Sequence, residues 1–165
     1  LGAASVEHAV FLTGAQAARI AAAGAFVVPT VWIYTDVLRL ASSGVLPRSL
    51  VPAAGRAVSA HPDALRRCLE AGVRLAMGTD AGLASQHGRN LSEAAAMMDA
   101  GVPAATALAA ATAGGRALLG GTGPSGDFVV FSRDPARPEV LRDPTAVLAV
   151  VREGTVVHAV ATHPG

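Results

Sequence analysis

Residues 73–82 read VRLAMGTDAG, an apolar run that ends at a threonine, an aspartate and a glycine. Two earlier segments have a similar character, because residues 4–8 read ASVEH and residues 25–30 read AFVVPT. The AFVVPT segment is almost entirely apolar, which is typical of a strand buried on both faces of a parallel sheet. We therefore predict three strands, over residues 4–8, 25–30 and 73–80.

Helical segments separate and follow these strands. Thr13 and Gln16 have the spacing of a capping box, which satisfies free N–H groups at a helix start, and Asn90 and Glu93 repeat it. The segment 31–55 is less regular, and we expect a loop with helical pieces there. Alternating strands and helices predict an α/β fold with parallel βαβ units. The predicted helices run from residue 13 to a stop at Gly24, from 62 to 71, from 90 to a stop at Gly101, and from 103 to 119.

The pattern changes after Gly120. Residues 121–126 are rich in turn-forming residues and are expected to form a linker. Three short strands are then expected, over residues 128–131, 147–151 and 155–160, with a hairpin turn between the last two. We therefore divide the chain into residues 1–120 and a β-strand segment of residues 121–165.

Composition excludes several classes of protein. The chain has 165 residues, 52% of them hydrophobic and 15% charged, which is typical of a globular domain. A net charge of +1, without a basic block and with 4% aromatic residues, argues against a nucleic-acid surface. The longest uncharged stretch is interrupted by Gly24 and Pro29, so we predict no membrane span. Cys68 is the only cysteine, which excludes an internal disulfide and favours a reducing, cytoplasmic setting.

Two polar residues follow predicted strands. His8 and Asp80 stand at the carboxyl ends of the first and third strands, the edge at which parallel α/β folds bind ligands. An imidazole and a carboxylate at this edge could share a divalent metal ion. The alternative is a structural role, with His8 as a hydrogen-bonded histidine and Asp80 as a turn residue.

Further candidates lie in the connecting segments. His87 and Arg89 are in the loop after the third strand, where they could orient a substrate carbonyl or carboxylate, or could simply be solvated. Tyr34 follows the second strand and could bind a substrate carboxylate, although a half-buried aromatic with a solvated hydroxyl is the more common case. His61 precedes Pro62 at the predicted start of a helix, so we interpret it as a cap residue.

A series of motifs resembles a known family. Their order and separations are similar to the second half of the amidohydrolase superfamily, closest to its imidazolonepropionase-like and prolidase-like branch. GTDAG is the most specific of them, and the resemblance covers nearly the whole chain. It implies the C-terminal portion of a (β/α)8 TIM-type barrel, with about three βα units over residues 1–120, followed by strands of a small composite β-domain over residues 121–165. The motifs are SVEH at 5–8, VPT at 28–30, GTDAG at 78–82 and HGRN at 87–90.

The resemblance also implies a chemistry, the metal-dependent hydrolysis of C–N bonds in a cyclic amide, a small peptide or an N-acyl amino acid. His8 would close the sixth barrel strand and Asp80 the eighth, where family members bind one or two divalent ions, usually zinc. Asp80 would ligate the metal and act as general base on the bound water, whose pKa a metal can lower from 15.7 to about 7. It would then pass the proton to the leaving nitrogen. His8 would be a metal ligand in a two-metal enzyme.

Parts of the family pattern are not in this sequence. The superfamily has a His-x-His on the first strand, a bridging lysine or acid on the fourth and a histidine on the fifth, and residues 1–165 contain none of these. We therefore expect the chain to need the N-terminal half of the barrel as a partner and to be inactive alone. Two alternatives stay open, a one-metal deaminase of the same superfamily and a non-catalytic α/β remnant or interaction domain.

Overall fold

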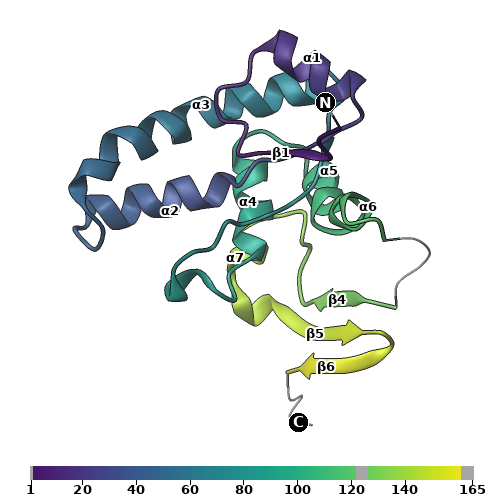
Figure 1. Ribbon diagram of the computed structural model, residues 1–165. Coiled ribbons are helices and arrows are strands. Elements are labelled where there is room, and N and C mark those ends of the chain that lie inside the picture. Colours follow the sequence, from purple (N-terminus) through teal and green to yellow (C-terminus); the bar gives the residue numbers. More distant parts are fainter. Residues whose placement is uncertain (1, 122–125, 161–165) are drawn as a thin grey trace.

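Two three-stranded sheets organise the chain (Figure 1). The computed structural model describes residues 2–121 and 126–160, so residues 122–125 of the expected linker lie outside the described residues. The first sheet is parallel with strand order β1-β2-β3, and the second is antiparallel with order β4-β5-β6. The predicted α/β fold is confirmed at this level. The strands are β1 (Ser5–Glu7), β2 (Phe26–Val28), β3 (Arg74–Leu75), β4 (Phe128–Phe131), β5 (Val147–Arg152) and β6 (Thr155–Ala159).

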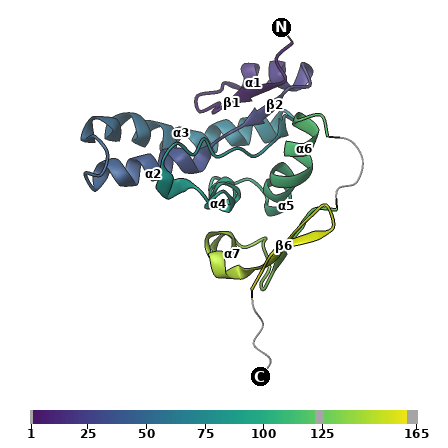
Figure 2. The ribbon, with the colours of Figure 1, turned by 60° about the horizontal axis from the view of Figure 1, so that its bottom comes forward.

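Helices cover and connect the sheets. Helices α4, α5 and α6 lie between the parallel sheet and the antiparallel sheet, and α7 lies beside α4 (Figure 2). Among the described residues, no helix is both long and apolar enough to cross a membrane. The helices are α1 (Gly14–Ala22), α2 (Val31–Ser42), α3 (Val51–Glu70), α4 (Leu91–Asp99), α5 (Ala104–Ala109), α6 (Gly115–Leu118) and α7 (Pro138–Arg142), with a π-helical turn over Ala110–Gly114.

The central strand β2 anchors the core. All three of its residues are buried, and it pairs in register with β1 on one side and β3 on the other. Val27 packs with Leu65, Met97 and other buried apolar residues of the surrounding helices. This agrees with the apolar run from which the strand was predicted, because a strand covered on both faces needs apolar side chains at every position.

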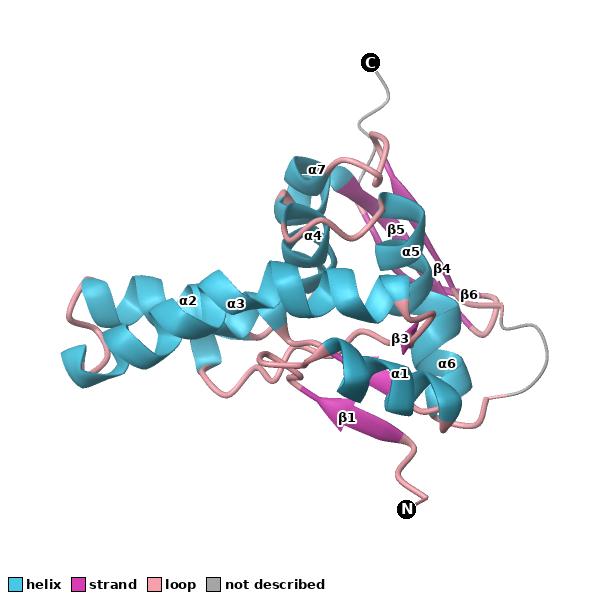
Figure 3. Ribbon diagram, turned by 90° about the horizontal axis from the view of Figure 1, so that it is seen from above, coloured by secondary structure: helices cyan, strands magenta, loops and turns pink. Residues whose placement is uncertain are grey.

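The prediction for residues 31–55 is wrong, because most of this segment is helical. α2 and α3 form an antiparallel pair that projects from the rest of the molecule (Figures 1 and 3). The start of α2 is rich in β-branched and aromatic residues, which have modest helix propensity. Its Trp32, Ile33 and Leu40 are nonetheless buried. Tertiary packing against α3, rather than local preference, therefore stabilises this helix.

The two predicted capping boxes have different outcomes. Thr13 caps α1 through the backbone N–H of Gln16, and the Gln16 side chain binds the Thr13 backbone, so this prediction is confirmed. The prediction for Asn90 is wrong, because its side chain makes no capping hydrogen bond. Glu93, the predicted partner of Asn90, binds a distant helix instead. The Glu93 oxygens accept hydrogen bonds from the backbone N–H groups of Val31 and Trp32, each at 2.8 Å.

Glu93 is fully buried in this position. Burial raises the pKa of its carboxyl to about 7 from an ordinary 4.5, against the lowering effect of the two backbone hydrogen bonds. The carboxylate thus joins α4 to the N-terminus of α2, where the first N–H groups of a helix lack intrahelical partners.

The π-helical turn packs closely against the backbone at the end of β3. The backbone N–H of Met77 donates to the carbonyl oxygen of Ala110 at 3.0 Å, and the same oxygen accepts from the Gly115 N–H. The turn lies so close to the strand that a Cβ atom at Gly114 would overlap the carbonyl oxygen of Leu75. Glycine is therefore required at Gly114 because a backbone, which cannot move aside as a side chain can, occupies the space.

Replacing Gly114 with alanine is expected to lower the free energy of unfolding by about 1–3 kcal/mol, the usual cost of overpacking. Gly55 of α3 is the matched control, because a Cβ there meets nothing within 4 Å. Gly55→Ala should be neutral or stabilising by up to about 1 kcal/mol, through its higher helix propensity. Urea unfolding of both variants measures the difference, and equal effects would contradict the close approach.

The free energy of unfolding is expected to fall as pH rises from 4.5 to about 7 through the contribution of Glu93. In this window the folded protein holds a proton that an unfolded glutamate has released, so each pH unit favours the unfolded state. The full effect is on the order of 3 kcal/mol. Urea unfolding across this range should show a shallower pH dependence for Glu93→Gln than for the parent chain, and parallel curves would count against a buried, protonated Glu93.

Candidate active site

The ends of the three parallel strands share an unusual backbone conformation. His8 and Ala9 follow β1 with φ values of 64° and 53°, Thr30 follows β2 with 51°, and Asp80 follows β3 with 51°. These are four of the five non-glycine residues with positive φ among those described, and the fifth, Glu153, is in the β5–β6 turn. Such conformations are costly for residues with a Cβ and cluster at functional sites. The carboxyl edge of the sheet is therefore the candidate functional site.

His8 is oriented by the neighbouring strand end. Its Nδ1 lies 2.8 Å from the hydroxyl oxygen of Thr30, and its ring is partly buried. Within the described part of the chain, Nε2 makes no hydrogen bond. A histidine held at one nitrogen and open at the other has the arrangement typical of metal-ligating histidines.

Tyr34 of α2 lies near both His8 and Asp80 at this edge. Its ring lies edge-on to the His8 ring, with centroids 6.1 Å apart. Burial raises the pKa of its phenol, and the negative charge of Asp80 raises it further. The structure thus brings three of the predicted site residues, His8, Tyr34 and Asp80, to one place. Asp80 is exposed there.

His61 forms hydrogen bonds with the backbone at this edge. The prediction that it is a cap residue is wrong. α3 starts ten residues earlier, at Val51, and runs through Pro62, so His61 lies inside the helix with 1% of its surface exposed. Its Nε2 lies 3.1 Å from the carbonyl oxygen of Pro29 and 3.2 Å from that of His8. Two acceptors identify this nitrogen as the protonated one. Burial lowers the pKa of His61, so a neutral imidazole bridges the ends of β1 and β2.

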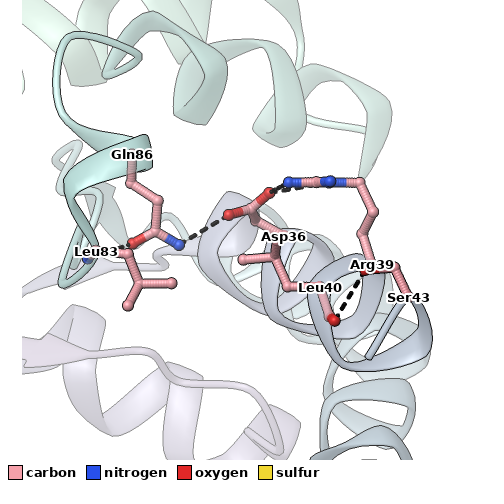
Figure 4. A network of polar contacts seen from close by, with 6 residues as sticks. All are labelled: Asp36, Arg39, Leu40, Ser43, Leu83 and Gln86. Atoms are coloured by element: carbon pink, nitrogen blue, oxygen red, sulfur yellow. Dashed lines mark hydrogen bonds and ion pairs between the residues drawn. The ribbon is translucent and has the colours of Figure 1, made fainter. Parts of the chain in front are cut away.

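The loop that follows Asp80 is fixed to α2 by residues that the sequence analysis missed. Figure 4 shows the buried Gln86, whose Nε2 donates to Asp36 at 2.8 Å and whose Oε1 accepts from the backbone N–H groups of Gly82 and Leu83 at 3.0 Å. Arg39 donates to the other Asp36 oxygen at 2.7 Å. Burial alone would raise the pKa of Asp36, but these hydrogen bonds and the Arg39 charge outweigh it and lower the pKa. The spacing of Asp36 and Arg39 was the only local signal for this network.

The other two predicted site residues lie elsewhere. Arg89 is exposed, and its guanidinium lies 5.6 Å from the centre of the Trp32 ring. It lines a cavity of about 310 Å³ between α2, α3 and α4, together with Asp36 and Arg39. His87 is exposed after the short helical turn Ala84–Gln86. No contact of either residue with His8 or Asp80 is found in the described residues, so a substrate-binding role for them stays a prediction.

Comparison with known proteins decides the family. The model of the amidohydrolase family matches residues 2–157. The chain belongs to this family. The resemblance seen in the motifs is thereby confirmed for nearly the full length of the sequence.

Two solved structures have the same fold. A Xaa-Pro dipeptidase with methionine bound in its active site is 27% identical, with a TM-score of 0.79 over 94% of this chain and 40% of that one. A prolidase complexed with N-methylphosphonate-L-proline is 24% identical, with a TM-score of 0.84 over 96% of this chain and 41% of that one. The chain therefore spans about two fifths of the length of these relatives.

A curated relative is closer in sequence but shorter in overlap. An uncharacterized protein of Mycobacterium tuberculosis is 40% identical over 84 residues, which are 48% of this chain and 23% of that protein. This relative adds no activity to the comparison, and like the solved structures it is much longer than the segment it shares with this chain.

The metal chemistry of the family sets a requirement that this chain meets in part. No group of three or more His, Cys, Asp or Glu side chains in residues 2–121 and 126–160 is arranged to hold a metal ion. His8 and Asp80 supply a nitrogen and a carboxylate, whereas a catalytic zinc normally has three protein ligands. The open Nε2 of His8 and the exposed carboxylate of Asp80 have the chemistry of metal ligands, and their role as ligands stays a prediction.

Replacing Asp80 with asparagine is expected to lower the pKa of Tyr34, because a nearby negative charge disfavours the phenolate. The pKa should stay above its ordinary value, since burial is the larger cause. The measurement is the ultraviolet absorbance of phenolate during a pH titration in chelator, with the titration of the Tyr34→Phe variant subtracted. Asp63→Asn, at an exposed carboxylate on α3, is the control. An Asp80→Asn curve that coincides with the parent curve would contradict the proximity of Asp80 to Tyr34.

Proposed function

We propose that this chain is the C-terminal portion of a (β/α)8 barrel in a metal-dependent amidohydrolase that cleaves the C–N bond of a dipeptide or N-acyl amino acid. The observation that carries the proposal is the convergence of His8, Tyr34 and Asp80 at the carboxyl edge of the parallel sheet. In TIM-barrel enzymes that edge is where catalysis takes place. Residues 1–120 would form the barrel part, and residues 121–165 would contribute strands to a small β-domain.

Relatives support this class of substrate. The Xaa-Pro dipeptidase was solved with methionine in its active site, and the prolidase with N-methylphosphonate-L-proline. Both ligands carry a free α-carboxylate. The proposal for this chain is accordingly a small peptide-like substrate with a C-terminal carboxylate.

A divalent metal ion such as zinc fits the residues present. His8 through Nε2 and Asp80 through its carboxylate would hold it, with the remaining ligands supplied by the N-terminal half of the barrel. When bound, such an ion polarises the substrate carbonyl and makes water acidic enough to react at neutral pH.

Asp80 would move the proton. Its exposed carboxylate takes a proton from the attacking water as the new C–O bond forms at the carbonyl carbon. It then delivers that proton to the nitrogen as the C–N bond breaks, which yields a carboxylic acid and an amine. The second water proton leaves with the acid and passes to the amine at neutral pH, so the products are a carboxylate and an ammonium group. The hydrogen bonds of Gln86 to Gly82, Leu83 and Asp36 fix the loop that follows Asp80 to α2.

Tyr34 would bind the substrate. A tyrosine phenol is neutral at physiological pH, and the raised pKa of Tyr34 keeps it so, which lets its O–H donate to an acceptor. The carboxylate of a dipeptide is such an acceptor. A phenolate, by contrast, would repel it.

The direct test is hydrolysis of a proline-ended dipeptide by the protein that carries the whole barrel, on one chain or with the missing half added. Asp80→Asn is expected to lower kcat on the order of 10²–10⁴-fold, the usual contribution of a general acid–base. Asp63→Asn is the control and should keep the parent rate. Activity should also disappear in chelator and return with zinc.

Other outcomes separate the alternatives. If the assembled barrel shows no metal-dependent hydrolysis and Asp80→Asn changes none of its properties, the chain is a non-catalytic remnant or interaction domain. Release of ammonia with one bound metal per barrel identifies a one-metal deaminase instead. Two metals per barrel with release of a free amino acid agree with the proposal.

A further inference from the structure

A buried acid outside the site holds the helix that carries Tyr34. Glu93 of α4 has no exposed surface, and it takes no part in the proton transfer assigned to Asp80. Its two oxygens accept the backbone N–H groups of Val31 and Trp32, which lie more than 60 residues earlier in the chain. These are the first two residues of α2. Glu93 therefore does the work of a helix cap from a different helix.

The side chain that would ordinarily cap α2 makes a different hydrogen bond. Thr30 stands at the N-cap position, where a threonine hydroxyl usually accepts a hydrogen bond from the first turn. Its side chain makes no such bond, and its backbone is left-handed. The hydroxyl lies instead 2.8 Å from Nδ1 of His8. Because Glu93 satisfies the helix terminus, the Thr30 hydroxyl is available to orient His8.

The same helix start places Tyr34. Tyr34 follows Trp32 by two residues in the first turn of α2, and its ring contacts both His8 and His61. Loss of the cap would leave two buried N–H groups unsatisfied, a strong drive for this turn to shift or for Thr30 to rotate back to the helix. Either change would alter the surroundings of His8 and Tyr34 without touching them directly.

We propose that Glu93 is a positioning residue of the candidate active site, which caps α2 from α4 so that Thr30 orients His8 and Tyr34 keeps its place beside it. This inference rests on the proposed roles of His8 and Tyr34 for its functional meaning. The physical coupling it describes can be measured without catalysis.

The test compares Glu93→Ala and Glu93→Gln with Met97→Ala. Met97 is the matched control for lost packing, because it lies one turn later on α4, is equally buried, and belongs to the same apolar core as Val31 and Trp32 without accepting their N–H groups. Each variant is made in the protein as its gene encodes it. The readout is the pKa of Tyr34 in chelator, from phenolate absorbance after subtraction of the same variant carrying Tyr34→Phe.

Both Glu93 variants are expected to shift the Tyr34 pKa from its raised value toward the ordinary 10, with Glu93→Gln giving the smaller shift because it keeps one acceptor oxygen. Met97→Ala should lower the Tm and leave the Tyr34 titration unchanged. If the Glu93 variants lower the Tm and titrate like the parent protein, Glu93 is structural only and the proposal is overturned. If Glu93→Ala does not fold, Glu93→Gln decides.

Kinetics distinguish this inference from the proposed function. With an active barrel, Glu93→Gln should raise KM for the dipeptide more than it lowers kcat, because Tyr34 binds the substrate and Asp80 moves the proton. If no hydrolysis is found but the Tyr34 pKa shifts as expected, the positioning stands and the reaction assignment fails. If hydrolysis is found and the Tyr34 pKa does not shift, the reaction assignment stands and the positioning role of Glu93 is overturned.

Discussion

The N-terminus of α2 is the constraint on which the candidate site depends. Val31 and Trp32 begin this helix in the interior, so their N–H groups have neither helical partners nor access to water. An unsatisfied buried donor costs about 1–3 kcal/mol. Glu93 supplies both acceptors at once, and one buried carboxylate thereby fixes the junction between β2, α2 and α4. The positions of Thr30 and Tyr34 follow from that junction.

The pKa values of two buried carboxylates near the site are shifted in opposite directions. Asp36 has the Arg39 guanidinium beside it and accepts a hydrogen bond from Gln86, so its pKa is lowered and it is charged at neutral pH. Glu93 has only backbone N–H partners, and burial raises its pKa to about 7. The first acid is therefore a permanent tether for the loop after Asp80, whereas the second is close to its titration point at neutral pH.

The carboxyl edge of the parallel sheet has strained backbone conformations and only part of the ligands of a metal site. His8, Thr30 and Asp80 all adopt left-handed backbone conformations, and the hydrogen bonds of His61 and Thr30 hold the first two in place. The chain spans about two fifths of the length of its solved relatives, so it corresponds to one part of such a molecule. Its two candidate metal ligands are consistent with a site completed by the rest of a barrel.

The sequence by itself determined the strand pattern and the positions of His8 and Asp80 at strand ends, because apolar runs that end in polar residues and glycine are local signals. Its motifs also carried the resemblance to the family. The capping box of Thr13 and Gln16 is local in the same way. Only the tertiary structure decided that residues 31–42 are helical, that His61 lies inside α3, that Glu93 caps α2 rather than its own helix, and that Arg89 lies against Trp32. Each of these depends on contacts between residues far apart in the chain, where the burial of a donor or a ring outweighs local preference, and no short sequence pattern records which distant group will be its partner.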